Sequence, residues 1–405
     1  MEKFTSQRDI NRLTALLALT YMVSYLTRIN FGAVVSEMTI ATGIPRRLLS
    51  LSLTGSFVTY GIGQIFSGVL GDRISPKKLV GLGLVLTVAM NALLPFCGSP
   101  WAMMAVWCIN GLAQAMLWPP IVRIMSALLS AGEYNRSVTK VSWGSSFGTI
   151  LIYLLSPLII LWVGWKGVFL FCAGSGLLMI FLWMTKAPDL PAPGTGARAA
   201  AGKSSSAVLF SPLMLLLMVA IVLQGMLRDG ITTWMPSFVS ESFQLGSAVS
   251  ILTGVLLPVF SIVCNTLTAR IHETKIRNPI TCSGLLFGAG AAFALALYLS
   301  FGRNAAGSVF LCAALTGSMH GVNLLLICMV PRYFERYGNV STASGVLNAC
   351  TYVGSALSTY GIAALSETAG WKPTILLWSL IALIGFILCM ALIRPWNKQF
   401  PIEKE

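Results

Sequence analysis

Charged residues are scarce in this chain. Only 10% of its 405 residues are Asp, Glu, Lys or Arg, while 56% are hydrophobic. A soluble domain carries about 25% charged residues. The sequence also lacks a P-loop, a His-x-x-x-His pattern and clustered carboxylates, and it has only two histidines. These absences remove the common metal and phosphoryl-transfer sites, so we expect no enzyme activity, no bound metal and no cofactor.

The nine cysteines form no metal or disulfide pattern. They are scattered singly, mostly inside apolar stretches, and no Cys-x-x-Cys spacing occurs. Small apolar filler in helices explains such cysteines better than a metal site or a disulfide. The N-terminus likewise lacks a short apolar region followed by a small-residue cleavage site, so residues 15–35 are interpreted as part of a retained first span.

Long apolar stretches fill most of the sequence. A helix of about 20 residues crosses a ~30 Å hydrocarbon core, and we predict twelve such spans. Their ranges are 11–37, 48–70, 79–97, 100–129, 137–161, 166–186, 208–240, 248–269, 279–300, 305–331, 338–365 and 372–393. Consecutive prolines in Trp118-Pro119-Pro120 predict a bend in the fourth span. The expected fold is an all-α membrane protein of twelve transmembrane helices in two six-helix halves, with the lipid bilayer around it.

Residues 187–207 separate the two sets of six spans. The segment is poor in large apolar side chains and rich in Pro, Gly, Ser and Ala, as flexible linkers are. It predicts an N-terminal half over 1–186, a cytoplasmic linker over 187–207 and a C-terminal half over 208–405. Two such halves indicate parallel repeats that hold a substrate between them near the membrane midplane.

The net charge of +14 follows the predicted topology. Of the 27 Lys and Arg residues, 19 lie in the termini and the loops on one side, and five lie in the opposite loops. By the positive-inside rule, both termini and the linker are cytoplasmic. The charge therefore gives no reason to expect a nucleic-acid partner. Since no organelle-targeting tail is evident, we expect a multi-pass protein of a bacterial plasma (inner) membrane.

Two arginines lie deep in apolar stretches. Arg28 belongs to the first predicted span and Arg228 to the seventh, at matching depths. An Arg at the centre of a membrane helix costs about 2.5–3.5 kcal/mol on insertion scales, so a retained one usually has a function. The two spans open the two halves and would occupy equivalent places. The pair predicts a site for a small anion, with the two side chains facing each other.

Helical spacing places further hydrogen-bond donors on the same face as each arginine. Tyr21, Tyr25 and Arg28 are spaced i, i+4, i+7, which puts them on one helical face. Gln224 and Arg228 are likewise i, i+4. Phenol hydroxyls donate hydrogen bonds, and the planar Arg fork matches a phosphate bidentately. We therefore predict two walls of substrate-binding residues.

The alternative for the arginines is a structural ion pair. Asp229 directly follows Arg228 in the sequence. Neighbours in a helix point about 100° apart, so we expect Asp229 to be poorly placed to neutralise Arg228. An interhelical pair of Asp229 with Arg28 or Arg123 stays open.

The loop after the second span carries a more specific pattern. Its sequence, Gly68-Val-Leu-Gly-Asp72-Arg73-Ile-Ser-Pro-Lys77-Lys78, resembles the G-x-x-x-D-R-x-G-x-R-R loop of the major facilitator superfamily. A Ser-Pro pair replaces the usual glycine and its neighbour. The resemblance implies the superfamily's twelve-helix fold and a conformational gate on the cytoplasmic side. The gate residues it implies are Gly68, Asp72, Arg73, Lys77 and Lys78.

Three further segments narrow the resemblance. They are Tyr21-Met-Val-Ser-Tyr25-Leu-Thr-Arg28-Ile-Asn30-Phe31, Asn110-Gly-Leu-Ala-Gln114-Ala-Met-Leu-Trp118-Pro119-Pro120 and Leu227-Arg228-Asp229-Gly-Ile-Thr-Thr-Trp234-Met-Pro236. They are similar to the first, fourth and seventh helices of the organophosphate:phosphate antiporter family. They lie in both predicted halves at the expected places, so the resemblance covers essentially the full chain. The resemblance implies a monomer that exchanges a phosphate ester for inorganic phosphate by alternating access.

Four more substrate-binding positions follow from the resemblance. Tyr352 is similar to a tyrosine that faces the cavity in the antiporters. His320 stands where those carriers have Tyr-Gly-Pro, and Asn323 closes the same segment, His320-Gly321-Val-Asn323. Ser142 takes the place of a histidine in the fifth helix of glycerol-phosphate carriers. For His320, a packed role at a helix interface is equally open. Ile29 replaces a lysine of the family, so the ester, and even the phosphate, stays undetermined.

Charge arithmetic supports exchange as the mechanism. At an assumed ~10 Å and an effective dielectric constant of ~20, two bare arginines repel by about 1.7 kcal/mol, so closing an empty site is disfavoured. A phosphomonoester carries about −1.5 to −2 charges at pH 7, enough to neutralise both.

Two other functions stay open. One is a proton-coupled symporter of a carboxylate such as a sugar acid, with Asp229 or His320 as the proton carrier. The other is a sensor that binds phosphate esters without moving them. We expect such a sensor to carry extra cytoplasmic domains or to act with partners, and the tails of this chain have no room for a folded domain.

Overall fold

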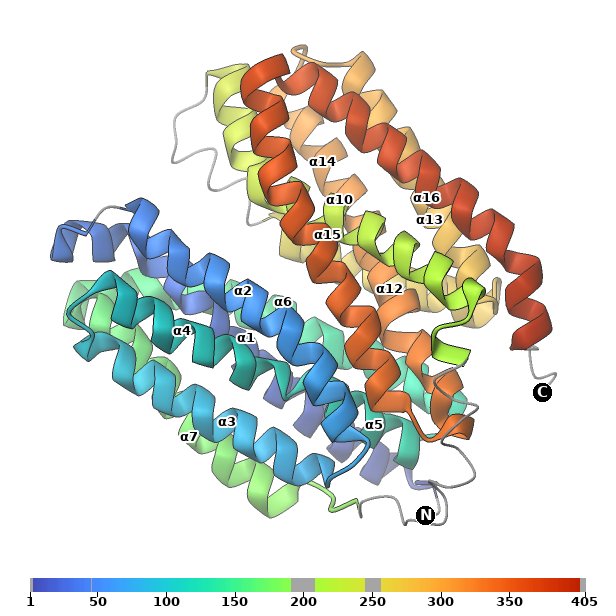
Figure 1. Cartoon of the computed structure of the whole chain (residues 1–405), viewed down its shortest axis with the longest axis horizontal. Helices are drawn as coiled ribbons and strands as arrows, with labels where there is room; N and C mark the ends of the chain where they lie inside the picture. Colours follow the sequence, from blue (N-terminus) through green and yellow to red (C-terminus); the bar gives the residue numbers. More distant parts are fainter. Residues whose placement is uncertain (1–2, 45, 191–207, 245–255, 401–405) are drawn as a thin grey trace. The chain divides into compact units, whose positions relative to one another are not determined.

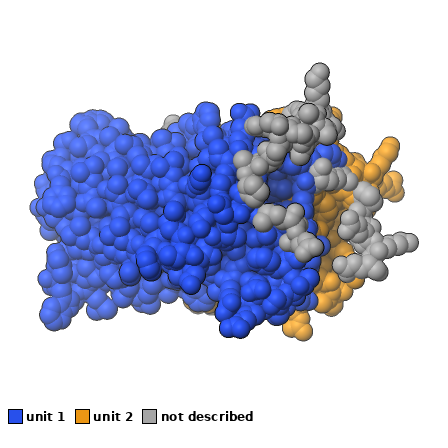
Figure 2. Space-filling model, turned by 90° about the horizontal axis from the view of Figure 1, so that it is seen from below, with its two compact units in different colours: residues 1–202, 334–349 blue, residues 203–333, 350–405 orange. Residues whose placement is uncertain are grey.

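The computed structural model describes residues 3–44, 46–190, 208–244 and 256–400. Over these ranges the chain forms helices and short connections, without a strand. Its contacts divide it into two compact units, which Figure 2 colours separately. Unit 1 comprises residues 1–202 and 334–349, and unit 2 comprises residues 203–333 and 350–405. Most of the predicted linker, residues 191–207, lies outside the described residues, so the linker and the half boundaries stay predictions.

Unit 1 is built from the first seven helices (Figure 1). They are α1 (Gln7–Thr42), α2 (Arg46–Gly71), α3 (Pro76–Leu93), α4 (Pro100–Ala115), α5 (Trp118–Leu128), α6 (Ala131–Val163) and α7 (Trp165–Lys186), with a 3₁₀ turn at Leu94–Phe96. Helix α1 packs against α6 and α7, α2 packs against α4, and α3 packs against α7 and α4.

Unit 2 contains the later helices (Figure 1). They are α10 (Pro212–Phe243), α12 (Leu256–Thr274), α13 (Pro279–Leu299), α14 (Ala305–Asn323), α15 (Val340–Ala369) and α16 (Trp371–Gln399). A π-helical segment, Leu324–Met329, and a 3₁₀ segment, Val330–Tyr337, follow α14. The first residues of α15, up to 349, belong to unit 1. Helix α14 packs against α10, α12 and α13, and α16 packs against α10 and α13.

The helices have the composition of membrane spans. Eight helices among the described residues are long and apolar enough to cross a membrane. Large apolar side chains such as Trp162, Phe181 and Phe310 are exposed on them, as suits lipid rather than water as the surrounding medium. The predicted all-α membrane fold is confirmed, and the count of twelve spans stays a prediction.

Two local predictions have different outcomes. The predicted bend in the fourth span is confirmed, because α4 ends at Ala115 and α5 begins at Trp118, with prolines at its first positions, where their missing N–H groups cost nothing. The predicted span 248–269 puts His272 in the loop that follows it, but His272 lies in the last turn of α12, with its Nδ1 2.9 Å from the carbonyl oxygen of Ile276. That prediction was wrong because α12 continues past its apolar stretch.

Candidate functional site

The three predicted residues of the first span lie together on one face of α1. The Cζ atom of Arg28 lies 4.1 Å from the centroid of the Tyr25 ring and 4.8 Å from that of Tyr60 on α2. Tyr21 packs edge-on against Tyr25, with centroids 5.1 Å apart, and lies 4.7 Å from Trp118. Aromatic faces attract a guanidinium over this range. The two rings thus contact Arg28 at cation–π distance.

A buried polar network fixes the turn of α1 that precedes Arg28. The side-chain amides of Asn91 and Asn110 both donate to the Thr27 carbonyl oxygen, at 3.0 and 3.2 Å. Gln114 donates to Thr27 Oγ1 at 2.8 Å. All three amides are at most 1% exposed. Because polar groups in an apolar core are costly unless bonded, this network ties α1 to α3 and α4 in one register.

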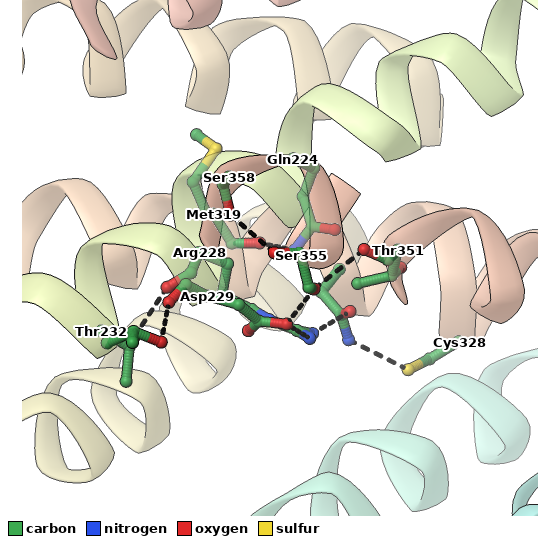
Figure 3. Close-up of polar contacts among 11 residues, drawn as sticks. Gln224, Arg228, Asp229, Thr232, Met319, Cys328, Thr351, Ser355 and Ser358 are labelled. Atoms are coloured by element: carbon green, nitrogen blue, oxygen red, sulfur yellow. Dashed lines mark hydrogen bonds and ion pairs between the residues drawn. The ribbon is translucent and has the colours of Figure 1, made fainter. Parts of the chain in front are cut away.

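The second arginine is held in a different way. Arg228 Nε donates to Asp229 Oδ1 at 2.6 Å, and Nη2 donates to Oδ2 at 2.9 Å (Figure 3). The two side chains keep 14% and 29% of their surface exposed. The prediction that Asp229 is poorly placed to neutralise Arg228 was wrong. An angle of 100° separates the Cβ directions, but the long Arg side chain folds back and brings its guanidinium to the neighbouring carboxylate.

Two other helices complete this polar cluster. From α14, Asn323 Oδ1 accepts a hydrogen bond from Arg228 Nη1 at 2.6 Å. From α15, the Ser355 hydroxyl donates to Asp229 Oδ2 (Figure 3). His320, one turn before Asn323, lies within electrostatic reach of both charged residues. The π-helical segment begins directly after Asn323, and such segments are frequent at functional sites.

Near each arginine, a glycine on a neighbouring helix lets the two helices approach closely. A Cβ at Gly148 of α6 would lie 2.5 Å from the Met22 carbonyl oxygen of α1. A Cβ at Gly354 of α15 would clash with the Val222 carbonyl oxygen of α10. Each carbonyl belongs to the residue six positions before the arginine of its half. The contact at Gly354 also brings the adjacent Ser355 within reach of Asp229.

The remaining predicted ligands have packing contacts of their own. Gln224 is fully buried, and its amide donates to the Met319 carbonyl oxygen at 3.1 Å. Ser142 Oγ donates to the Val138 carbonyl oxygen at 2.9 Å, within α6. Tyr352 is half-buried on α15, three residues before Ser355. Their roles in binding stay predictions.

Some residues at the site were not predicted from the sequence. Tyr60 contacts Arg28 and Ser355 contacts Asp229, and neither lies in a quoted segment. Asn91, Asn110 and Gln114 bond to Thr27, next to Arg28. Asn110 and Gln114 lie in a quoted segment, but no role was predicted for them. A signal was present, because Asn and Gln side chains inside apolar spans are rare unless they bond across helices. Only the packing of the helices shows near which arginine each of these side chains lies.

The predicted gate loop contacts the start of α15 within unit 1. Asp72 Oδ1 accepts the Ser341 backbone N–H at 2.9 Å, and Oδ2 accepts that of Thr342 at 2.6 Å. The first N–H groups of a helix lack partners within it and favour a negative charge. Burial raises the pKa of Asp72 to about 6, against the bonds from Thr342 and Ser341 and the charge of Arg123, which lower it.

The other gate residues differ in their surroundings. A Cβ at Gly68 would lie 2.8 Å from the Ser341 carbonyl oxygen, so the two backbones approach closely there. Arg73 and Lys78 are exposed, and Lys77 is half-buried. Arg123 donates to the carbonyl oxygen of Gly71 and, at 3.1 Å, to that of Ile74. Arg123 thus ties down the end of α2, while Asp229 is engaged by its own neighbour.

The comparisons with known proteins agree with this architecture. The family model of the Major Facilitator Superfamily matches residues 17–328. The membrane sensor protein UhpC of Salmonella typhimurium is 26% identical over 413 residues, 95% of this chain and 91% of that protein. The glycerol-3-phosphate transporter of Bacillus subtilis is 32% identical over 181 residues, 42% of this chain and 39% of that protein.

A solved structure supports the fold. The structure of the proton:xylose symporter XylE bound to 6-bromo-6-deoxy-D-glucose has a TM-score of 0.77 at 12% identity, covering 97% of this chain and 96% of XylE. At that identity the likeness shows the fold alone. The relatives named for phosphate esters are consistent with the resemblance to the organophosphate:phosphate antiporters. The chain belongs to the Major Facilitator Superfamily, as a multi-pass integral membrane protein.

Proposed function

We propose that this protein is a secondary active transporter that exchanges a phosphate ester for inorganic phosphate, by alternating access around Arg28 and Arg228. The observation that carries the proposal is the bidentate contact on Arg228. Two carboxylate oxygens of Asp229 occupy its Nε and Nη2 donors, which is the arrangement that two phosphate oxygens adopt on an arginine. The fork is therefore shaped to receive an oxyanion.

The neighbours of that fork suit the rest of an ester. Asn323 and Ser355 supply an amide and a hydroxyl beside the guanidinium, and such groups bond sugar or glycerol hydroxyls. The relative named as a glycerol-3-phosphate transporter supports the same substrate class. A small anionic substrate is thus the common element.

The ion pair of Arg228 with Asp229 changes the reason for proposing exchange. Arg228 is not a bare cation, because Asp229 neutralises its charge, so repulsion between two bare arginines does not disfavour closing of the empty site. Inorganic phosphate as the returning cargo is supported instead by the family resemblance. The proposal includes a monomer in a bacterial plasma (inner) membrane, with both termini cytoplasmic.

Counterflow in proteoliposomes tests the proposal. Vesicles that hold the purified protein are loaded with phosphate, labelled phosphate is added outside, and glycerol 3-phosphate, glucose 6-phosphate and glucuronate are added as competitors. We expect labelled phosphate to enter and one ester to block its entry. Uptake of glucuronate driven by a proton gradient, without phosphate exchange, would refute the proposal and favour the symporter.

One observation favours a sensor as the second candidate. The sensor-named relative is matched over 95% of this chain and 91% of its own length, which leaves little of that relative for an extra domain. The expected need for such a domain therefore does not count against a sensor. Binding of an ester to the purified protein, with no flux in the same vesicles, would identify this function.

A further inference from the structure

We infer that Asp229 is an internal counter-ion that competes with the ligand's anionic group for Arg228. The inference rests on the proposed function, because it takes Arg228 as a partner of that anion. It concerns a residue that the sequence analysis considered only as a proton carrier or a structural partner. In this role Asp229 sets how tightly anions bind.

The competition follows from which donors the carboxylate uses. Asp229 engages Nε and Nη2 of Arg228, and these two N–H groups form one edge of the planar guanidinium. A phosphate that binds this edge bidentately needs the same two donors. Both anions cannot occupy one edge, so the ligand binds there only after the carboxylate leaves.

The carboxylate is held in its competing position. Ser355 donates to Asp229 Oδ2, and Asn323 accepts from Nη1 on the other side of the guanidinium. Three helices thus preorganise the pair, which raises the free energy needed to open it. The pair keeps 14% and 29% of its side-chain surface exposed, so a small anion can still reach it.

Release of the carboxylate also selects among ligands. Once displaced, Asp229 is a charged acceptor beside a bound anion, and hydrogen-bond donors from the ligand stabilise it. An ester of a polyhydroxy alcohol carries several hydroxyls that can donate to it. Inorganic phosphate dianion has one. Asp229 therefore weakens the binding of inorganic phosphate more than that of the polyol ester.

The test measures equilibrium binding by purified protein in detergent, with inorganic phosphate and glycerol 3-phosphate as the two probes. Asp229→Asn keeps the shape of the side chain but removes its charge. We expect inorganic phosphate to bind this variant about 10-fold more tightly, as for loss of one close charge competitor, and the ester to gain less. Ser355→Ala keeps the charge, loosens the carboxylate, and should tighten phosphate binding about 2-fold.

Asp9→Asn is the matched control. It makes the same change of net charge at an exposed residue of α1, so we expect phosphate to bind it as it binds the wild type. Unchanged or weaker phosphate binding by both Asp229→Asn and Ser355→Ala would overturn the counter-ion role and leave the proposed function standing. Absence of phosphate and ester binding in the wild type and in every variant would overturn both.

Discussion

Arg28 of unit 1 and Arg228 of unit 2 contact different kinds of side chain. Arg28 lies against the rings of Tyr25 and Tyr60, whereas Arg228 is bound bidentately by Asp229. Stacking engages the face of a guanidinium, and an ion pair engages its edge. A ligand that binds the Nε–Nη2 edge of Arg228 must replace Asp229 there. The two arginines are therefore expected to contribute differently to binding and to stability.

Removal of Arg228 should have the largest effect on stability. Arg228→Ala leaves the Asp229 carboxylate without its cation, and breaking a buried pair costs about 3–5 kcal/mol. We expect a marked fall in the midpoint of thermal unfolding in detergent. The double variant Arg228→Ala/Asp229→Asn removes both charges and should recover most of the stability, but not phosphate binding. A double variant as unstable as Arg228→Ala would show that the unpaired Asp229 carboxylate does not cause the loss of stability.

A conservative change at Arg28 should mainly affect transport. Arg28→Lys keeps the positive charge but loses the planar group that stacks on Tyr25 and binds oxygens bidentately. We expect a loss of about 2 kcal/mol in anion binding, or about 30-fold, measured as the affinity for phosphate in counterflow. Wild-type affinity in this variant would mean that charge alone suffices in the first half.

Asp72 of the predicted gate loop can be tested through its dependence on pH. The carboxyl of Asp72 has a pKa of about 6 in contact with α15, against 3.8 when solvated. The intact contact binds a proton more tightly than the broken one, so lowering the pH from 7 to 5 stabilises it by about 1.3 kcal/mol. This stabilisation is lost as the pH rises through about 6.

Hydrogen exchange at Ser341 and Thr342 measures that contact, because their amides donate to Asp72. After correction for intrinsic exchange rates, we expect about 10-fold greater protection at pH 5 than at pH 7. Asp72→Asn should remove this pH dependence. Protection that falls with falling pH would contradict the sign of the pKa shift.

The smallest predicted effect concerns Tyr60, the second aromatic ring in contact with Arg28. Tyr60→Leu removes one aromatic face and keeps an apolar side chain, and a cation–π contact is worth about 1 kcal/mol. We expect about a 5-fold loss of phosphate affinity. Tyr60→Phe retains the ring and serves as the control, with affinity close to the wild type. Equal losses in the two variants would assign the effect to the hydroxyl instead.

The sequence predicts features that depend on one helix and fails where they depend on several. Scarcity of charge indicates the membrane fold, and the prolines after Trp118 mark the break between α4 and α5. Helical spacing groups Tyr25 with Arg28 because both lie on α1. The contact of Arg228 with Asp229 was predicted wrongly, since the direction of Cβ does not fix the head group of a long side chain.

Contacts between side chains on different helices could not be predicted from helical spacing. Ser355 meets Asp229 because glycine at the preceding position lets α15 approach α10, and periodicity does not tell which helices pack together. The amides around Thr27 likewise come from α3 and α4. Their polar character in apolar spans is visible in the sequence, but their target is not.

Phosphate counterflow by the double variant Arg228→Ala/Asp229→Asn tests the central claim most directly. This variant removes the fork that receives the anion, while its net charge equals that of the wild type. We predict that wild-type vesicles exchange labelled phosphate and that vesicles with the folded double variant do not. Exchange by the double variant at the wild-type rate would contradict the account, because the anion would then not need Arg228.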